Sequence, residues 1–172
     1  MVAPLHLPSP PRRDAALDAA LDELAVRHHP TVRAAVATLA ALRGHLATQA
    51  PALSSALDEL EAVIGAALAR EARVLVPHLR ALAAGVPDHT LFASLAALTP
   101  VLADDQRAAT AALGQLRAAL AAAEHRCAVC VTAADAAADL AGALAAHHRF
   151  TVESLLPRAR TRELALGSVP AC

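Results

Sequence analysis

The chain contains no tryptophan, tyrosine or lysine, and its only phenylalanines are Phe92 and Phe150. Proteins that bind single-stranded nucleic acids stack the bases on aromatic side chains, and nucleic-acid-binding domains in general carry a basic surface. Here 15 arginines are scattered along the sequence and are balanced by 16 acidic residues, which leaves a net charge of −1. The composition therefore argues against a protein that binds nucleic acid.

Long uncharged hydrophobic runs are also missing, although 56% of the residues are hydrophobic. Alanine accounts for 49 residues, and alanine favours helices but fills a core poorly. No window of about 18 residues lacks charged or strongly polar side chains, so the sequence predicts no transmembrane helix. The N-terminus has early prolines and late arginines, unlike a secretory signal peptide. We expect a disordered tail over residues 1–13 and a cytoplasmic protein.

Cysteine is scarce, and an odd number of cysteines in a presumed cytosolic chain argues against a disulfide framework. Cys127 and Cys130 form a single C-x-x-C pair, and Cys172 is the last residue. A thiol-dependent redox role for the pair would require a lowered thiol pKa at the start of the next helix. Without a thioredoxin-like context we favour a structural or incidental role for both.

Apolar residues recur at helical spacing along four segments, and no segment shows the alternation of a strand. The expected helices run from Asp14 to about Ala47, from Leu53 to Val76, from Thr99 to Ala123 and from Thr132 to Leu156. A short terminal helix over residues 158–166 precedes a mobile tail over 167–172. Because the connections between helices are mostly short, the sequence predicts one all-α domain over residues 14–166, an up-down-up-down four-helix bundle.

Helix-start signals and prolines set these expected boundaries. Asp14 and Thr99-Pro100 are typical first residues of helices, as are the capping boxes that begin at Ser55 and Thr132. Three prolines lie within or directly after the helical patterns: Pro30, Pro77 and Pro157. An interior proline removes a backbone hydrogen bond, so we expect each to kink or end its helix.

Each expected helix carries one polar residue inside its hydrophobic stripe: His29 (or its neighbour His28), Glu71, Gln106 and His147. In an up-down bundle, their offsets from the helix ends place all four about 22–27 Å from one common end, at a rise of about 1.5 Å per residue. A buried polar group must be hydrogen-bonded, paired or bound to a metal. Four such groups at one level indicate a site.

Two interpretations of this polar layer are open. Two imidazoles with one carboxylate are a ligand set of non-haem Fe(II), and the Gln106 amide is a weaker candidate ligand. Alternatively, Glu71 accepts hydrogen bonds from both imidazoles and Gln106 closes a metal-free network. Residue types alone favour the network, because buried metal sites usually contain more carboxylates.

The remaining histidines are expected to lie away from this layer. His78 and His89 flank a predicted loop and should be solvated, and His148 should point to a different face from His147. His45 lies about 24 Å along a straight helix from His29, so joint ligation would require a break in that helix.

Four stretches resemble the hemerythrin-like (HHE cation-binding) domains, and in particular the bacterial iron–sulphur cluster repair proteins. RHH at 27–29 resembles the family's first-helix histidine motif, and REARVLVP at 70–77 resembles its "KEE…LFP" segment. HHRFTVESLLPRA at 147–159 is similar to "H…LEN..LFPRA". Cys127 stands 20 residues before His147, as in the family.

The resemblance covers about residues 14–160 and implies a bundle that holds a non-haem di-iron centre with His and Glu ligands. His29, Glu71 and His147 fall at ligand positions, and His45 resembles a further family histidine. Three ligand positions are changed: Ala67 and Gln106 replace histidines, and Thr151 replaces a glutamate. A di-iron centre needs bridging carboxylates, and this chain offers one inward carboxylate. We therefore expect one iron ion or none.

By resemblance, the chain is a non-haem iron protein of the nitrosative and oxidative stress response that acts in iron–sulphur centre repair. Nitric oxide, O₂ and damaged iron–sulphur proteins are then its expected partners. The alternative is a metal-free helical scaffold or interaction module, for which a homodimer is one expected form. The sequence assigns no catalytic residue in either case.

Overall fold

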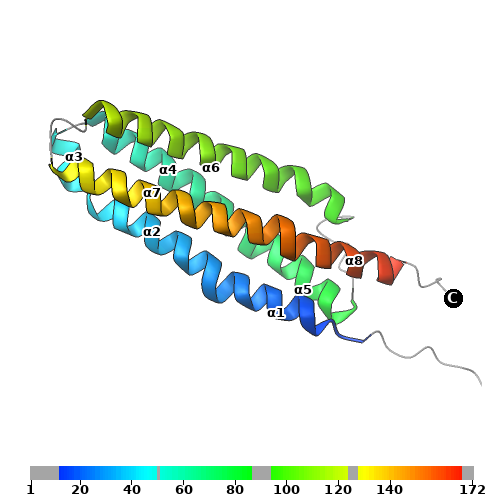
Figure 1. The fold of residues 1–172 in the computed structure, drawn as a ribbon. Helices are drawn as coiled ribbons and strands as arrows, with labels where there is room; N and C mark the ends of the chain where they lie inside the picture. Colours follow the sequence, from blue (N-terminus) through cyan, green and yellow to red (C-terminus); the bar gives the residue numbers. More distant parts are fainter. Residues whose placement is uncertain (1–11, 50, 87–93, 124–127, 168–172) are drawn as a thin grey trace, which may run out of the picture.

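The computed structural model describes residues 12–49, 51–86, 94–123 and 128–167. They form four helical rods (Figure 1). The first rod consists of α1 (Ala15–Glu23), the π-helical turn η1 (Leu24–His28), α2 (His29–Ala41) and α3 (Arg43–Gln49). The second consists of α4 (Pro51–Arg70), the π-helical turn η2 (Glu71–Leu75) and α5 (Val76–Ala84). The third is α6 (Leu95–Ala123), and the fourth consists of α7 (Ala128–Arg149), the π-helical turn η4 (Phe150–Leu155) and α8 (Leu156–Gly167).

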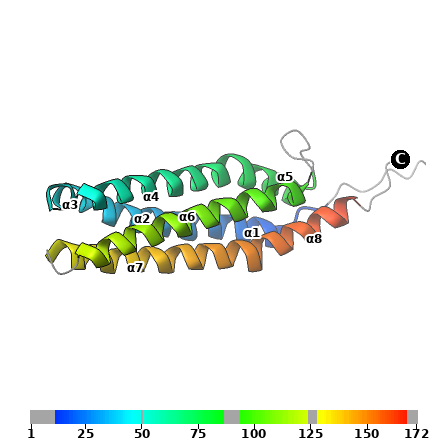
Figure 2. The ribbon, with the colours of Figure 1, turned by 90° about the horizontal axis from the view of Figure 1, so that it is seen from above.

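The rods lie side by side along one long axis (Figure 1 and Figure 2). Helix α4 packs on α6, α6 packs on α7, and α7 packs on α2. Helix α1 packs on α5 at the end where α8 also lies. The predicted all-α bundle of four helices is confirmed, and the described residues contain no strand.

Several helix boundaries differ from the expected ones. Asp14 caps α1 as predicted, because its carboxylate accepts hydrogen bonds from the amides of Ala16 (3.1 Å) and Leu17 (3.0 Å). The prediction that Thr99-Pro100 begins the third helix is wrong, since α6 begins at Leu95. A carboxylate from α8 explains the earlier start: Glu163 accepts a hydrogen bond from the Leu95 amide at 2.9 Å. The fourth helix also begins earlier than Thr132, at Ala128.

We expected Pro30, Pro77 and Pro157 each to kink or end its helix. None of them ends its helix in the structure. A π-helical turn lies at each, and the residue directly before each proline donates its amide to the carbonyl five residues earlier. These bonds are His29 to Leu24, Val76 to Glu71 and Leu156 to Thr151. A proline has no amide proton and its ring crowds the carbonyl four residues earlier, so a wider turn accommodates it. The chain continues as helix through Ala84 in the second rod and through Gly167 in the fourth.

A layer of polar side chains divides the apolar core into two clusters. The larger cluster includes Val32, Leu68 and Leu144, and the smaller includes Leu24, Leu75 and Leu155. In each of these three rods, buried polar residues lie in sequence between the two clusters: His29, Glu71, and His147 with Thr151. The two apolar clusters, one on each side of the polar layer, thus hold these side chains at one level along the bundle axis. A further buried polar residue, His78, lies in sequence among the residues of the smaller cluster.

One helical rod, Ala128–Gly167, is long and apolar enough to cross a membrane, with a mean hydropathy of 1.5 in its most apolar window. This criterion uses only the length and the composition of a helix, and core helices of soluble proteins also meet it. Within the bundle, α7 packs on α2 and α6, and residues such as Ala133, Ala137 and Leu140 are buried there.

Candidate metal centre

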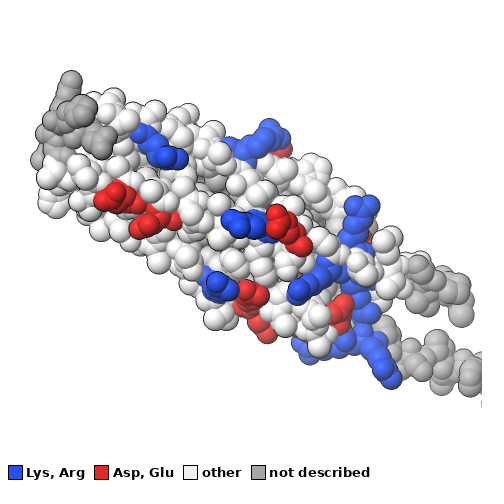
Figure 3. Space-filling view, in the orientation of Figure 1, with Lys and Arg blue, Asp and Glu red and all other residues white. Residues whose placement is uncertain are grey.

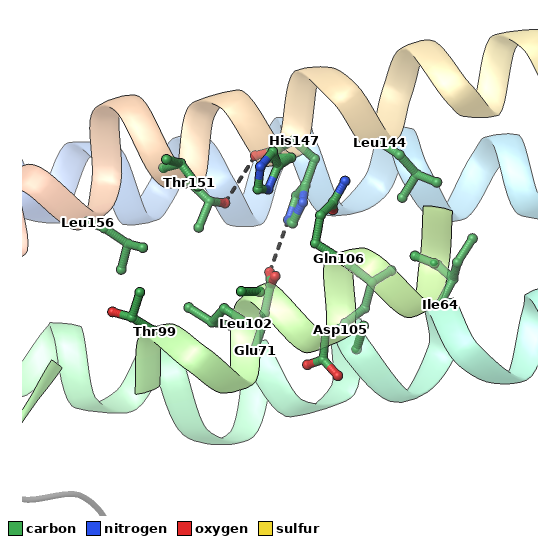
Figure 4. Close-up of a pocket in the computed structure, with 16 residues that line it drawn as sticks. Ile64, Glu71, Thr99, Leu102, Asp105, Gln106, Leu144, His147, Thr151 and Leu156 are labelled. Atoms are coloured by element: carbon green, nitrogen blue, oxygen red, sulfur yellow. Dashed lines mark hydrogen bonds and ion pairs between the residues drawn. The ribbon is translucent and has the colours of Figure 1, made fainter. Parts of the chain in front are cut away.

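Three buried side chains from three different rods meet in the polar layer. The Nε2 atom of His29 lies 2.9 Å from Oε2 of Glu71, and the Nε2 atom of His147 lies 3.0 Å from the same oxygen. The exposed fractions of the three residues are 5%, 7% and 7% for His29, Glu71 and His147. One ligand atom from each lies within 4.8 Å of the others. Figure 4 shows Glu71 and His147 pointing toward each other across the bundle.

The π-helical turns lie directly beside these three residues. His29 follows η1, Glu71 is the first residue of η2, and His147 lies three residues before η4 begins. A π-helical turn inserts one extra residue into a helix and changes the direction in which the flanking side chains point. The same turns let each rod contribute both a polar side chain here and apolar side chains to the clusters on either side.

The charge of Glu71 is stabilised by its two neighbours. Burial alone would raise the pKa of this carboxyl group, but hydrogen bonds from His147 and His29, together with their charges, outweigh burial and lower the pKa to about 2. Glu71 is therefore ionised near neutral pH. Its Oε2 accepts two N–H donors, and the two imidazole rings lie with their centroids 5.6 Å apart.

A cavity of about 100 Å³ borders Glu71 and His147 on the side of α6 and the fourth rod. Glu71 and His147 form part of its wall, and most of the remaining lining is apolar, including Leu102, Leu144 and Leu156 (Figure 4). Ala67, at the position where the resembled family has a histidine, also lines this cavity. The cavity therefore offers space for a small, mainly uncharged molecule next to the carboxylate.

Gln106, the fourth predicted site residue, lies in the wall of this cavity and beside His147 in Figure 4. It is half-buried, and its amide nitrogen lies 3.5 Å from the hydroxyl oxygen of Thr110 on its own helix. Thr151, where the family has a glutamate, is buried and donates its hydroxyl to the carbonyl of His147 at 3.0 Å. Neither side chain contributes a carboxylate to the layer.

Two histidines next to the candidate ligands have roles that sequence reasoning did not assign. His28, the alternative to His29, stacks on Phe150 with ring centroids 4.3 Å apart, so His29 is the residue that reaches Glu71. Burial and the nearby His147 lower the pKa of His28. His148 was expected on a different face from His147, but it is half-buried and lines the same cavity.

The prediction that His78 is solvated is wrong. His78 is only 5% exposed, and neither ring nitrogen has a hydrogen-bond partner among the described residues. The prediction placed His78 beside a loop, whereas α5 continues past Pro77 and buries His78 together with Leu75 and Leu82. The spacing of three residues from Leu75 and four residues from Leu82 was the available signal. His45 is exposed on α3, and His89 lies outside the described residues.

Cys130 is 1% exposed and is part of a disulfide, contrary to the expectation that the chain forms none. Cys127 and Cys172 lie outside the described residues. A buried, oxidised Cys130 is not an available thiol, so this structure gives no support to thiol-dependent redox activity at Cys130.

Comparisons with protein families, with curated proteins and with solved structures find no match to this chain. The chemistry of the site must therefore be judged from its own residues. Two imidazole nitrogens and one carboxylate fit a single transition-metal ion with further coordination positions open. They do not fit a di-iron centre, because the described part of the polar layer contains one buried carboxylate, Glu71.

Proposed function

We propose that this chain is an up-down-up-down, hemerythrin-like bundle that binds one divalent transition-metal ion, iron by resemblance, through His29, Glu71 and His147. The observation that supports the proposal most strongly is the convergence of these three buried ligand atoms, within 4.8 Å of one another, from three rods. Two histidines and one carboxylate are the protein ligands of many non-haem Fe(II) sites.

The three side chains can exchange their mutual hydrogen bonds for bonds to a metal ion. Glu71 is already ionised, so it needs no deprotonation to become a ligand. Each histidine can move its ring proton from Nε2 to Nδ1 and present the freed Nε2 lone pair to the metal. A bound metal ion would supply a coordination position for a small ligand, and the adjoining cavity of about 100 Å³ provides the space for it.

We further propose, from the resemblance, that the small ligand is nitric oxide or O₂. The protein would then act in the cytoplasm in the nitrosative and oxidative stress response, on damaged iron–sulphur proteins. Support for this part comes from the four resembling sequence stretches and from the small, mainly apolar lining of the cavity. Gln106 and His148 would face the ligand from the cavity wall.

An anaerobic calorimetric titration with Fe(II) tests the site. The expected result for the wild type is saturation at one metal ion per chain, with binding lost in His147→Ala because two protein ligands remain. His45→Ala is the matched control, since His45 is an exposed histidine on α3. Equal Fe(II) binding by wild type and His147→Ala would contradict the proposal.

One observation favours the alternative of a metal-free scaffold: Glu71 and the two histidines already satisfy one another through hydrogen bonds of 2.9 and 3.0 Å. A closed polar network of this kind can be replaced by apolar packing at little cost. Under this alternative, replacing the whole network at once (His29→Leu, Glu71→Met and His147→Leu in one variant) leaves the free energy of unfolding unchanged or raises it in urea denaturation. A loss of several kcal/mol would argue against the scaffold.

A further inference from the structure

A second hollow lies on the outside of the bundle, between α2 and α4, which run side by side (Figure 2). This groove has a volume of about 360 Å³, within the range of small-molecule sites, roughly 300–1,000 Å³. Its apolar lining consists of small and branched side chains: Val36, Ala37, Ala40, Ile64, Leu68 and Ala69. Ile64 and Leu68 separate it from the cavity beside Glu71, because they line both hollows.

The two ends of the groove carry charges of opposite sign. The pairing of Arg43 with Glu61 and of His29 with Glu71 fixes the register of the two helices. Residue numbers therefore rise along α2 as they fall along α4, which puts Arg33 at one end of the groove and Glu61 at the other.

Only the charge of Arg33 is free. Glu61 forms an ion pair with Arg43, which also lies 3.0 Å from Asp58. Arg33 is exposed, and it forms no ion pair with any residue that the structure describes. The groove thus combines an apolar floor with one uncompensated positive charge at the end nearer the polar layer.

We propose that this groove binds a medium-chain aliphatic monocarboxylate, with the carboxylate on Arg33 and the alkyl chain along the floor. A guanidinium group matches a carboxylate with two parallel N–H donors, and one free arginine matches one negative charge. Arg33 and Ala40 are seven residues apart, which gives the groove a length of about 10 Å at the helical rise. Burial of the alkyl chain against these side chains supplies the hydrophobic contribution.

Gly65 keeps the middle of the groove open. A Cβ atom added at this position would meet no atom within 4 Å, so the space above it is not used by the protein's own packing. Because Gly65 lines the groove, we expect a larger side chain at residue 65 to occupy part of it. This position allows the groove to be filled while the helix is preserved, since leucine is a better helix former than glycine.

The binding test is a calorimetric titration of the metal-free full chain with decanoate below its micelle concentration. We expect saturation at one decanoate per chain, binding of decanol at least about tenfold weaker, and no binding of decyltrimethylammonium. Because the protein is metal-free, the result is independent of the proposed metal site. Absence of saturable decanoate binding, or equal binding of all three probes, would overturn the proposal.

Two pairs of variants locate the binding. Gly65→Leu should abolish decanoate binding, whereas Gly114→Leu on α6, where an added Cβ also meets nothing within 4 Å, should not change it. Arg33→Ala should weaken binding about tenfold or more, whereas Arg117→Ala, an exposed arginine on α6, should have no effect. Unchanged binding in Gly65→Leu would overturn the proposal. So would a wild-type dimer that Gly65→Leu converts to a monomer, which would identify a second copy as the occupant.

Discussion

Glu71 connects the two histidines of the polar layer, because a single oxygen, Oε2, accepts a hydrogen bond from each. Neither histidine has another partner for this nitrogen among the described residues. Burying the carboxylate is unfavourable unless donors surround it, and here the two imidazoles provide them. The properties of Glu71 therefore determine how the layer behaves with and without a metal ion.

The stability of the metal-free protein should fall in acid through Glu71. Its pKa is about 2 in the folded protein, against an ordinary value of 4.5. A lowered pKa stabilises the folded state above about pH 4.5, and this stabilisation is lost as the pH falls toward 2. Its full size is on the order of 3 kcal/mol.

Urea denaturation between pH 5 and pH 2.5 measures this effect, with Glu71→Gln as the comparison. We expect the free energy of unfolding of the wild type to fall more steeply than that of the variant, because the variant lacks the carboxylate whose pKa is lowered by folding. Parallel pH profiles for the two proteins would show that Glu71 is not ionised between its histidines in the way the structure shows.

The π-helical turns are the elements that bring the ligands together. In the second rod, the amide of Val76 bonds to the carbonyl of Glu71, and Pro77 follows with no amide proton to offer. A regular turn would rotate Glu71 relative to Leu75 by about 100°, the angle per residue of an α-helix. Either the carboxylate or the apolar face of α5 would then leave the core.

Replacing Pro77 by alanine restores an amide that can complete a regular α-helical turn. We expect Pro77→Ala to retain its helical circular dichroism but to bind Fe(II) at least about tenfold more weakly. The reason is that the π-helical turn would no longer orient the Glu71 carboxylate toward the two histidines. Pro51→Ala, at the exposed start of α4, is the control and should bind as the wild type does. Wild-type affinity in Pro77→Ala would show that core packing alone maintains the turn.

Sequence reasoning could place the helices because their apolar spacing is a local property. It did not predict where α6 and α7 begin or that a π-helical turn forms at each of the three prolines. These features depend on residues that are distant in the sequence. Leu95 begins α6 because Glu163 from the last helix accepts its amide. A proline within a helical pattern is compatible with an end, a kink or a wider turn, and only packing on both sides decides among them. His78 was misplaced for the same reason, since its burial requires the helix to continue past Pro77.

At the scale of the whole molecule, the polar layer has a fixed height because it lies between two apolar clusters. The level of His29, Glu71 and His147 could be predicted from the sequence, since an error of a few residues in a helix end moves a side chain only a few ångströms along the axis. The sequence could not show which side chains form the closest contacts. Gln106 shares their level, yet it borders the cavity and its amide lies next to Thr110.

Ion pairs on the surface contribute little to the stability of the bundle. Figure 3 shows arginines interspersed with acidic residues over the visible face. Some arginines of the molecule are paired across rods, as Arg80 of α5 is with Asp22 of α1 at 2.7 Å. Exposed pairs of this kind contribute about 0–1 kcal/mol each. The association of the rods therefore depends mainly on the two apolar clusters and on the polar layer between them.

We expect the polar layer to hold a single metal ion. Metal content per chain, measured by inductively coupled plasma mass spectrometry on untagged protein purified without oxygen from iron-replete cells, tests it most directly. We predict about one iron per chain, retained in His45→Ala and absent from His147→Ala. No metal above background, also after reconstitution with Fe(II), Mn(II) and Zn(II), would contradict it and favour the scaffold. Two irons per chain would contradict it as well, because the layer would then contain ligands beyond His29, Glu71 and His147.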